Sequence, residues 1–162
     1  AGLKEYPDHI ALLYGYALLA QSLHQFGSTE FMLQRIIDID PNHTNALNAL
    51  GYAYADRGIK LTEAELLIRK ALANEPENAA IIDSLGWVSY RLGHLRQSLT
   101  LLTKAYDIMP AAEIAAHLGA VQWALGDTKG AFKTWNLALS IEPDNALIKQ
   151  AILDAQNEFQ RD

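Results

Sequence analysis

Cysteine is absent from the 162 residues, which excludes disulfide bonds, thiolate metal ligands and thiol nucleophiles. No apolar run approaches the roughly 18 residues that a membrane-spanning helix needs. The first residues also lack the charged-then-apolar pattern of a secretion signal. A glycine-rich phosphate loop and a nucleophile elbow are missing too. These absences argue against the common catalytic classes.

Basic residues are few: 13 Lys and Arg stand against 19 Asp and Glu, and the formal net charge is −6. The positive charges are scattered rather than gathered into a stripe, so nucleic acid is not an expected partner. Histidines lie far apart and offer no metal-ligand spacing. Neighbouring acids such as Asp38 and Asp40, or Glu75 and Glu77, flank expected helix ends without a pocket around them. We therefore expect no metal, no cofactor and no enzymatic activity.

Prolines divide the chain at nearly equal intervals, at positions 7, 41, 76, 110 and 143. Proline lacks a backbone N–H and keeps the residue before it out of the α region, so each proline should end a helix. Asn or Asp side chains follow closely, at Asp8, Asn42, Asn78 and Asp144, and can accept the free N–H groups of the next helix. Each proline therefore predicts the end of one helix and the start of another.

Between the prolines the apolar spacing predicts two helices for each unit. We expect pairs at 44–57 and 62–74, 79–92 and 95–108, and 112–125 and 128–141. Gly58, Gly93 and Gly126 should end the first helices, and Thr62 to Glu65 should form a capping box. In the less regular first unit we expect helices near 9–23 and 28–39, with His24 at the place of Gly58. Residues 1–6 resemble the end of an earlier helix, and 145–160 predicts a one-sided capping helix with Leu147, Ile148, Ala151, Ile152, Ala155 and Phe159 on its apolar face.

A Leu-Gly pair recurs in the first helix of three units, at Leu50-Gly51, Leu85-Gly86 and Leu118-Gly119. With alanines in the second helix and the closing proline, this pattern resembles the 34-residue tetratricopeptide repeat. The resemblance implies an all-α fold: a right-handed superhelix, or α-solenoid, of antiparallel helix pairs with a C-terminal capping helix. The chain would be a single array with units at about 8–41, 42–76, 77–110 and 111–143, a capping helix at about 145–160, and further repeats upstream.

A more specific resemblance rests on the sequence of residues 47–57, 68–72, 82–88 and 113–119. These stretches are similar to the C-terminal array of proteobacterial envelope lipoproteins, among them the adaptor of a carboxyl-terminal processing protease. The resemblance implies a periplasmic location, with outer-membrane anchoring through a region upstream of Ala1. It also implies that a periplasmic protease, its substrates, or a secretion or assembly complex is the partner.

Tetratricopeptide arrays commonly bind an extended peptide or a partner helix along the first helices, on the concave side. The first helices here carry Asn, Trp, Tyr and Arg, side chains that combine contact area with hydrogen bonding. The candidate protein-binding residues are Tyr14, Asn45, Asn48, Tyr52, Asp83, Trp87, Tyr90, Arg91, His117 and Trp123. For each aromatic residue, burial in the core is the competing interpretation.

Two functions remain open at this point. The first is a non-catalytic scaffold or adaptor that binds protein or peptide in the groove. The alternative is self-association into a homo-oligomer, because the apolar faces within residues 1–39 have no polar cap at that edge.

Overall fold

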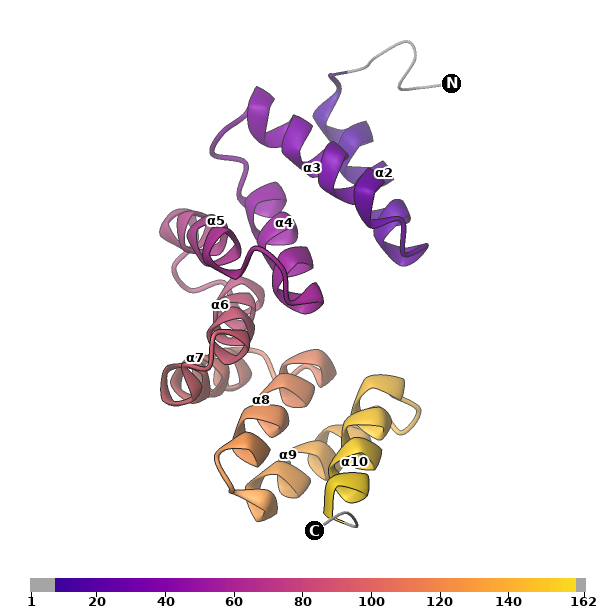
Figure 1. Cartoon of the computed structure of the whole chain (residues 1–162), viewed down its shortest axis with the longest axis vertical. Coiled ribbons are helices and arrows are strands. Elements are labelled where there is room, and N and C mark those ends of the chain that lie inside the picture. Colours follow the sequence, from indigo (N-terminus) through magenta and orange to yellow (C-terminus); the bar gives the residue numbers. More distant parts are fainter. Residues whose placement is uncertain (1–7, 160–162) are drawn as a thin grey trace. The chain divides into compact units, whose positions relative to one another are not determined.

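The structure is a computed structural model that describes residues 8–159. Within that range nine helices and no strand follow one another through short turns (Figure 1). The resemblance to tetratricopeptide repeats therefore predicted the fold class correctly, and the predicted helices are confirmed to within a few residues at each end. The expected helix end at 1–6 lies outside the described residues. The helices are α2 (Ile10–Ser22), α3 (Phe26–Ile39), α4 (Thr44–Arg57), α5 (Leu61–Asn74), α6 (Ala79–Arg91), α7 (Leu95–Ile108), α8 (Ala112–Ala124), α9 (Thr128–Ile141) and α10 (Ala146–Phe159).

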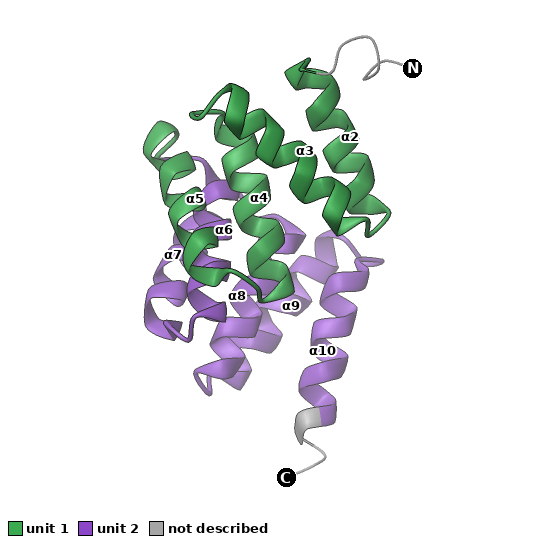
Figure 2. Ribbon diagram, turned by 45° about the horizontal axis from the view of Figure 1, so that its top comes forward, with its two compact units in different colours: residues 1–76 green, residues 77–162 purple. Residues whose placement is uncertain are grey.

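The chain forms two compact units, unit 1 (1–76) and unit 2 (77–162), shown in two colours in Figure 2. In unit 1 the antiparallel pairs are α2 with α3 and α4 with α5, and α3 also packs on α4. In unit 2 the pairs are α6 with α7 and α8 with α9, α7 packs on α8, and α10 packs on both α8 and α9. The division between the units coincides with the boundary between the second and third predicted repeats.

The second helices end as the prolines predict. Helices α3, α5, α7 and α9 each stop two residues before a proline, at positions 39, 74, 108 and 141. The N-terminal caps were predicted correctly only at Asn78, which accepts the N–H groups of Ala80 and Ile81.

The other predicted caps are wrong. His9 and His43 accept through Nδ1, and Asn145 accepts through Oδ1, each two residues after its proline. Asp8 instead forms an ion pair with Arg35, and Asp144 one with Lys149. Asn42 donates its backbone N–H to Asp40. The residue directly after proline lies one position too early for its side chain to reach the first turn.

The turns within the pairs use left-handed backbone, as the glycines predict. Gly58, Gly93 and Gly126 have φ values of 67°, 81° and 84°. His24, at the corresponding place in the first pair, also has a positive φ, of 56°. The predicted capping box at Thr62 is wrong: α5 begins at Leu61, so its cap is Lys60, at a φ of 47° and without a side-chain hydrogen bond.

The Leu-Gly glycines bring the helices of a pair into close contact. A Cβ atom built on Gly86 would lie 2.6 Å from Cγ of Leu102. One built on Gly51 would lie 2.6 Å from Cγ1 of Ile68, and one on Gly119 would lie 2.0 Å from Nε1 of Trp135. Leu102, Ile68 and Trp135 are all fully buried, so the second helix fills the space that the missing side chain leaves. These glycines therefore have a packing role within each helix pair.

The capping helix α10 buries a narrower face than the sequence predicts. Ile148 and Ala155 are buried and belong to the apolar core of α8 and α9, with Ala151 and Ile152 packed against that core. Leu147, predicted on the same face, is 59% exposed. Successive residues are about 100° apart around a helix, so Leu147 falls outside the stripe that Ile148 begins.

Unit 1 contains a half-exposed polar cluster that joins three of its elements. Glu30 of α3 accepts from the Tyr54 hydroxyl of α4 at 2.7 Å and from Nζ of Lys60 at 2.6 Å. These two hydrogen bonds, with Lys60 the larger cause, lower the pKa of the Glu30 carboxyl from its ordinary value of 4.5. Glu30 also raises the pKa of the Lys60 ammonium. The carboxylate therefore stabilises the contact between adjacent helix pairs only while it is ionised.

Leucine at Gly86 should overpack the α6–α7 contact. We expect Gly86→Leu to lower the free energy of unfolding by about 1–3 kcal/mol, because Leu102 has no room to withdraw. Urea denaturation measures the change. Gly27 of α3 is the matched control, since nothing lies within 4 Å of its Cβ position, and Gly27→Leu should stay within about 0.5 kcal/mol of the parent. Equal effects at both positions would contradict the packing interpretation.

The Glu30 cluster predicts a specific pH dependence. Because the folded-state pKa of Glu30 is lowered, its stabilising effect is complete above the ordinary value of 4.5 and is lost as the pH falls through the folded-state pKa. The stability difference between the parent and Glu30→Gln, measured by urea unfolding at several pH values, should therefore be constant near neutrality and shrink in acid. In a Lys60→Met background this pH dependence should largely disappear. Its persistence there would show that Lys60 is not the main cause.

Candidate functional site

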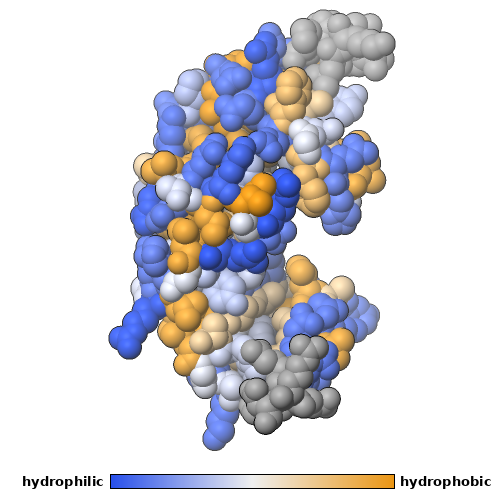
Figure 3. Space-filling view, in the orientation of Figure 1, coloured by the Kyte–Doolittle hydropathy of each residue, from blue (hydrophilic) through white to orange (hydrophobic). Residues whose placement is uncertain are grey.

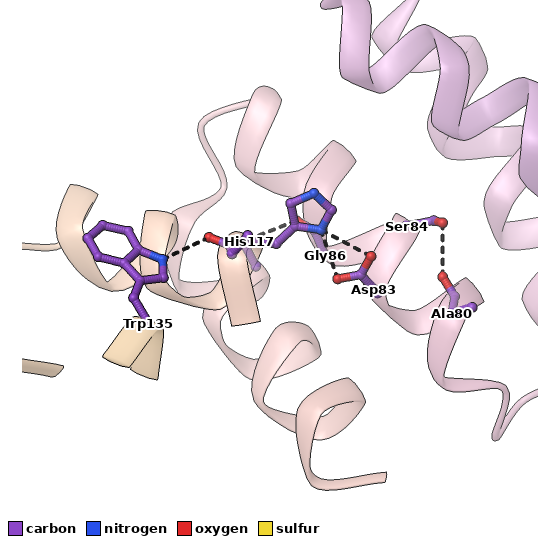
Figure 4. A network of polar contacts seen from close by, with 8 residues as sticks. Ala80, Asp83, Ser84, Gly86, His117 and Trp135 are labelled. Carbon is purple, nitrogen blue, oxygen red and sulfur yellow. Dashed lines mark hydrogen bonds and ion pairs between the residues drawn. The ribbon is translucent and has the colours of Figure 1, made fainter. Parts of the chain in front are cut away.

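The candidate site in unit 2 is built on a buried polar contact between α6 and α8, the first helices of two consecutive repeats. Nδ1 of His117 lies 2.9 Å from Oδ1 and 3.1 Å from Oδ2 of Asp83. The two side chains are only 10% and 6% exposed. A buried carboxylate is costly unless it is paired, so the imidazole stabilises Asp83 in place and the contact connects consecutive repeats. Figure 4 shows the His117 ring facing the Asp83 carboxylate.

An aromatic stack lies on this polar contact. The Trp87 ring stacks on the His117 ring, with centroids 4.2 Å apart, and on the Tyr90 ring, with centroids 5.0 Å apart. The Arg91 guanidinium lies 5.9 Å from the Trp87 ring centroid. Trp87 and Tyr90 are half-buried and Arg91 is exposed. We call these five residues, Asp83, Trp87, Tyr90, Arg91 and His117, the aromatic patch.

Hydrogen bonds from side chains to backbone carbonyls stabilise the helices that carry the aromatic patch and their neighbours. Ser98 of α7, at a position where alanine is usual, donates its buried hydroxyl to the Gly86 carbonyl at 2.8 Å. Ser84 donates to the Ala80 carbonyl, and Nε1 of Trp135 donates to the Ala116 carbonyl at 3.3 Å (Figure 4). Nε1 of Trp87 is buried and has no hydrogen-bond partner among the residues that the structure describes. The ring is thus held by stacking and packing contacts rather than by a hydrogen bond of its N–H.

Trp123, the remaining candidate of unit 2, lies on α8 apart from the Asp83 contact. Its ring meets Phe132 edge-on at 5.8 Å and lies 6.4 Å from the Trp135 ring. Trp123 lines a cavity of about 270 Å³ together with Tyr90, Trp135 and Asp154. Tyr90 is therefore shared by the aromatic patch and the cavity.

The four candidates of unit 1 form no comparable cluster among the described contacts. The Tyr14 and His43 rings are 6.1 Å apart, and burial raises the pKa of the Tyr14 hydroxyl. Asn45 is exposed, and Asn48 and Tyr52 are half-buried on the same helix, α4. Oδ1 of Asn48 is buried without a hydrogen-bond partner in the described chain. A binding role for these four residues stays a prediction.

The pairing of Asp83 with His117 was not predicted, although both were named as candidates. Their separation of 34 residues, one repeat length, was the available signal, because equivalent positions of consecutive first helices lie near one another. Asp154 of α10 was missed entirely, since nothing in the repeat pattern indicates what the capping helix adds. No group of three acidic or histidine side chains suited to a metal ion occurs in residues 8–159.

Comparison with known proteins agrees with the arrangement of helices. The chain is 42% identical over 118 residues to the TPR repeat-containing protein PA4667 of Pseudomonas aeruginosa, a match covering 73% of this chain and 20% of that protein. A thermophilic TPR protein of Thermus thermophilus, TTC0263, superimposes with a TM-score of 0.82 at 20% identity, over 95% of this chain and 84% of the other. No protein-family model matches the chain.

A mutant O-GlcNAc transferase of Thermobaculum terrenum is similar to a smaller part of the chain. It superimposes with a TM-score of 0.67 at 26% identity, over 70% of this chain but 22% of the enzyme. Sequence and fold together define the chain as a tetratricopeptide repeat protein. Repeats of this kind are generally non-catalytic scaffolds for protein–protein interaction, and enzymes that contain them act through other domains. The chain spans about a fifth of the length of PA4667.

Among the helices that the structure describes, none has both the length and the apolar character to cross a bilayer.

The buried contact between Asp83 and His117 predicts a measurable coupling. A double-mutant cycle of Asp83→Ala and His117→Ala, read by urea denaturation, should give a coupling free energy of about 1–3 kcal/mol. The matched control is Glu77 with Lys104, an exposed pair in the same unit, with side chains 76% and 47% exposed. That pair should couple by less than about 1 kcal/mol. Similar coupling in both cycles would show that burial does not strengthen the Asp83 contact.

Proposed function

We propose that the chain is a non-catalytic scaffold whose aromatic patch on α6 and α8 binds a protein partner. The observation that carries the proposal is the Trp87 ring, stacked between Tyr90 and His117 and still partly exposed. Trp, Tyr and Arg are the residues that most often dominate the energy of protein interfaces. A ring already held in place loses little conformational entropy when a partner binds.

The polar members of the patch favour a polypeptide as the ligand. Arg91 offers donors to backbone carbonyls or to acidic side chains, and the Tyr90 ring offers contact area with a polar tip. In unit 1 the candidates on α4, namely Asn45, Asn48 and Tyr52, offer side chains of the same kind, because asparagine can bond both to an N–H and to a carbonyl of an extended peptide.

The proposed setting is a bacterial envelope protease, secretion or assembly complex in the periplasm. The sequence of residues 47–57 and 82–88, which resembles that of envelope lipoprotein adaptors, supports this setting. The similarity to a Pseudomonas aeruginosa protein supports it as well. The partner would then be a periplasmic protease or its substrates, and an upstream region would supply the outer-membrane anchor.

Self-association is the second candidate function, and the surface of α2 favours it. Leu19 and Leu23 are 54% and 58% exposed, and a hollow of about 290 Å³ is lined by Ala11, Leu12, Gly15, Tyr16 and Leu19. Apolar side chains also lie among hydrophilic ones on the face shown in Figure 3. Such a surface could bury itself against a second copy. Light scattering over a dilution series tests this function, and a monomer at all concentrations would exclude it.

Partner capture tests the scaffold proposal. The chain is used as bait in periplasmic and cytosolic extracts of Pseudomonas aeruginosa, the organism of its relative PA4667. Captured proteins are quantified by mass spectrometry. Trp87→Ala with Arg91→Ala should lower capture of the specific partners by about tenfold or more, the effect of losing an interface hot spot. Enrichment from the periplasmic extract alone would support the envelope setting.

The control variant changes two residues that have the same helical spacing but lie on the second helix of a pair. Lys133 and Leu137 are exposed on α9, four residues apart like Trp87 and Arg91. Lys133→Ala with Leu137→Ala should leave capture unchanged. Circular dichroism and thermal unfolding confirm that both variants are folded. Undiminished capture by a folded patch variant would exclude the aromatic patch as the binding surface.

A further inference from the structure

The cavity beside the aromatic patch has a composition of its own. Its walls are three aromatic rings, Tyr90, Trp123 and Trp135, from three different helices, and three alanines. Asp154 of α10 is the one charged residue in the lining. The whole cavity belongs to unit 2 and combines ring faces with a carboxylate.

A small residue at one repeat position contributes to the cavity. Trp87 directly follows Gly86 on α6, whereas Ala120 directly follows Gly119 at the equivalent place on α8. Where α6 carries an indole, α8 therefore carries only a methyl group, and Ala120 is one of the residues that line the cavity. The capping helix α10 contributes the opposite wall through Ala151 and Asp154.

The aromatic walls are held in position by their own contacts. Trp135 is 1% exposed, its Nε1 donates to the Ala116 carbonyl, and its ring meets Phe132 edge-on at 5.7 Å. Phe132 also supports Trp123 edge-on. The carboxylate is oriented as well, because Nε2 of Gln150 donates to Oδ1 of Asp154 at 2.8 Å. The site is therefore organised before any ligand arrives, which lowers the entropic cost of binding.

The chemistry of these walls selects for a cation. The faces of Trp and Tyr rings carry partial negative charge and attract ammonium and guanidinium groups within about 6 Å. The chain itself provides examples, with Lys60 4.5 Å from the Tyr54 ring and Arg57 4.7 Å from the Phe26 ring. A carboxylate at the same site adds charge attraction, and the net charge of −6 disfavours an anionic ligand throughout.

Size favours a single side chain. The volume of about 270 Å³ lies just below the range of roughly 300–1,000 Å³ typical of small-molecule sites. We propose that this cavity receives one lysine or arginine side chain of a protein partner, with the stem against the rings and the charged end at Asp154. The proposal rests on the proposed function, because it presumes a polypeptide partner.

Short peptides test the cavity directly. The full chain, labelled with ¹⁵N, is titrated with the capped tripeptides Gly-Lys-Gly, Gly-Arg-Gly and Gly-norleucine-Gly, and the indole N–H resonances of its three tryptophans are followed. The lysine and arginine peptides should shift the Trp123 and Trp135 resonances more than that of Trp87, which does not line the cavity. The norleucine peptide, which has the stem without the charge, should bind at least about fivefold more weakly.

Charge variants separate Asp154 from the overall charge of the chain. Asp154→Asn should weaken binding of the lysine peptide by about fivefold or more and leave the norleucine peptide unaffected. Asp144→Asn is the matched control, since Asp144 is a fully exposed carboxylate outside the cavity lining. It should change lysine binding by less than about twofold, because an exposed charge is screened by salt. Both side chains are exposed, so neither variant should disturb folding.

Three results would overturn the proposal. These are equal binding of the lysine and norleucine peptides, equal effects of Asp154→Asn and Asp144→Asn, or unshifted Trp123 and Trp135 resonances at saturating peptide. The test is independent of partner capture. If capture depends on Trp87 and Arg91 but the peptides do not bind, the scaffold function stands and the cation site fails. If the peptides bind but no specific partner is captured, the cavity accepts a cationic side chain and the scaffold function fails.

Discussion

The close contact between a first-helix glycine and the second helix of the same pair is the constraint on which the other features depend. Gly51, Gly86 and Gly119 each lie where a Cβ atom would meet a buried side chain of the partner helix. The contact fixes the rotation of the first helix. The residue after each glycine is then turned about 100° around the helix and cannot enter the same gap. Tyr52, Trp87 and Ala120 occupy that next position, so the packing of the pair decides which side chains are available for binding.

The buried contact between Asp83 and His117 needs a different explanation from stability. Removing a carboxylate and its partner from water costs free energy that the contact returns only in part, and apolar residues of similar size often stabilise a protein as well or better. The polar pair instead fixes the orientation of a side chain. The hydrogen bond orients the imidazole, and the imidazole supports the Trp87 ring at 4.2 Å. An apolar pair would provide no hydrogen bond to fix the orientation of the side chain that supports Trp87.

The sequence was sufficient to predict the helices because its signals are local. Proline and glycine act through the backbone of their own residue, so helix ends followed directly from positions such as Pro41 and Gly93. His24, which the repeat frame places at the position of Gly58, shares the positive φ of that glycine. The caps at His9 and His43 did not follow from such signals, because imidazole is not among the preferred capping side chains and acts here only through its place in the turn.

The candidate site could be predicted only in part, for a physical reason. Repeat spacing places residues on a helix face, which sufficed to select Asp83, Trp87 and His117 one by one. Their mutual contacts depend on the offset between α6 and α8, which is determined by the packing of α7 on both of them. Predicting the cavity would also have required the position of α10. Asp154 reaches the cavity only because α10 packs on α8 and α9.

Tyr90 connects the two surfaces of unit 2, which carry charges of opposite sign. On one side its ring stacks on Trp87, next to the Arg91 guanidinium; on the other it lines the cavity that contains Asp154. A partner that covers Tyr90 would meet a positive group at Arg91 and a negative group at Asp154. Charges of opposite sign at two ends of an aromatic surface contribute little to affinity in water but penalise a reversed orientation. The aromatic rings would supply contact energy, and the two charges would set the direction in which the partner lies.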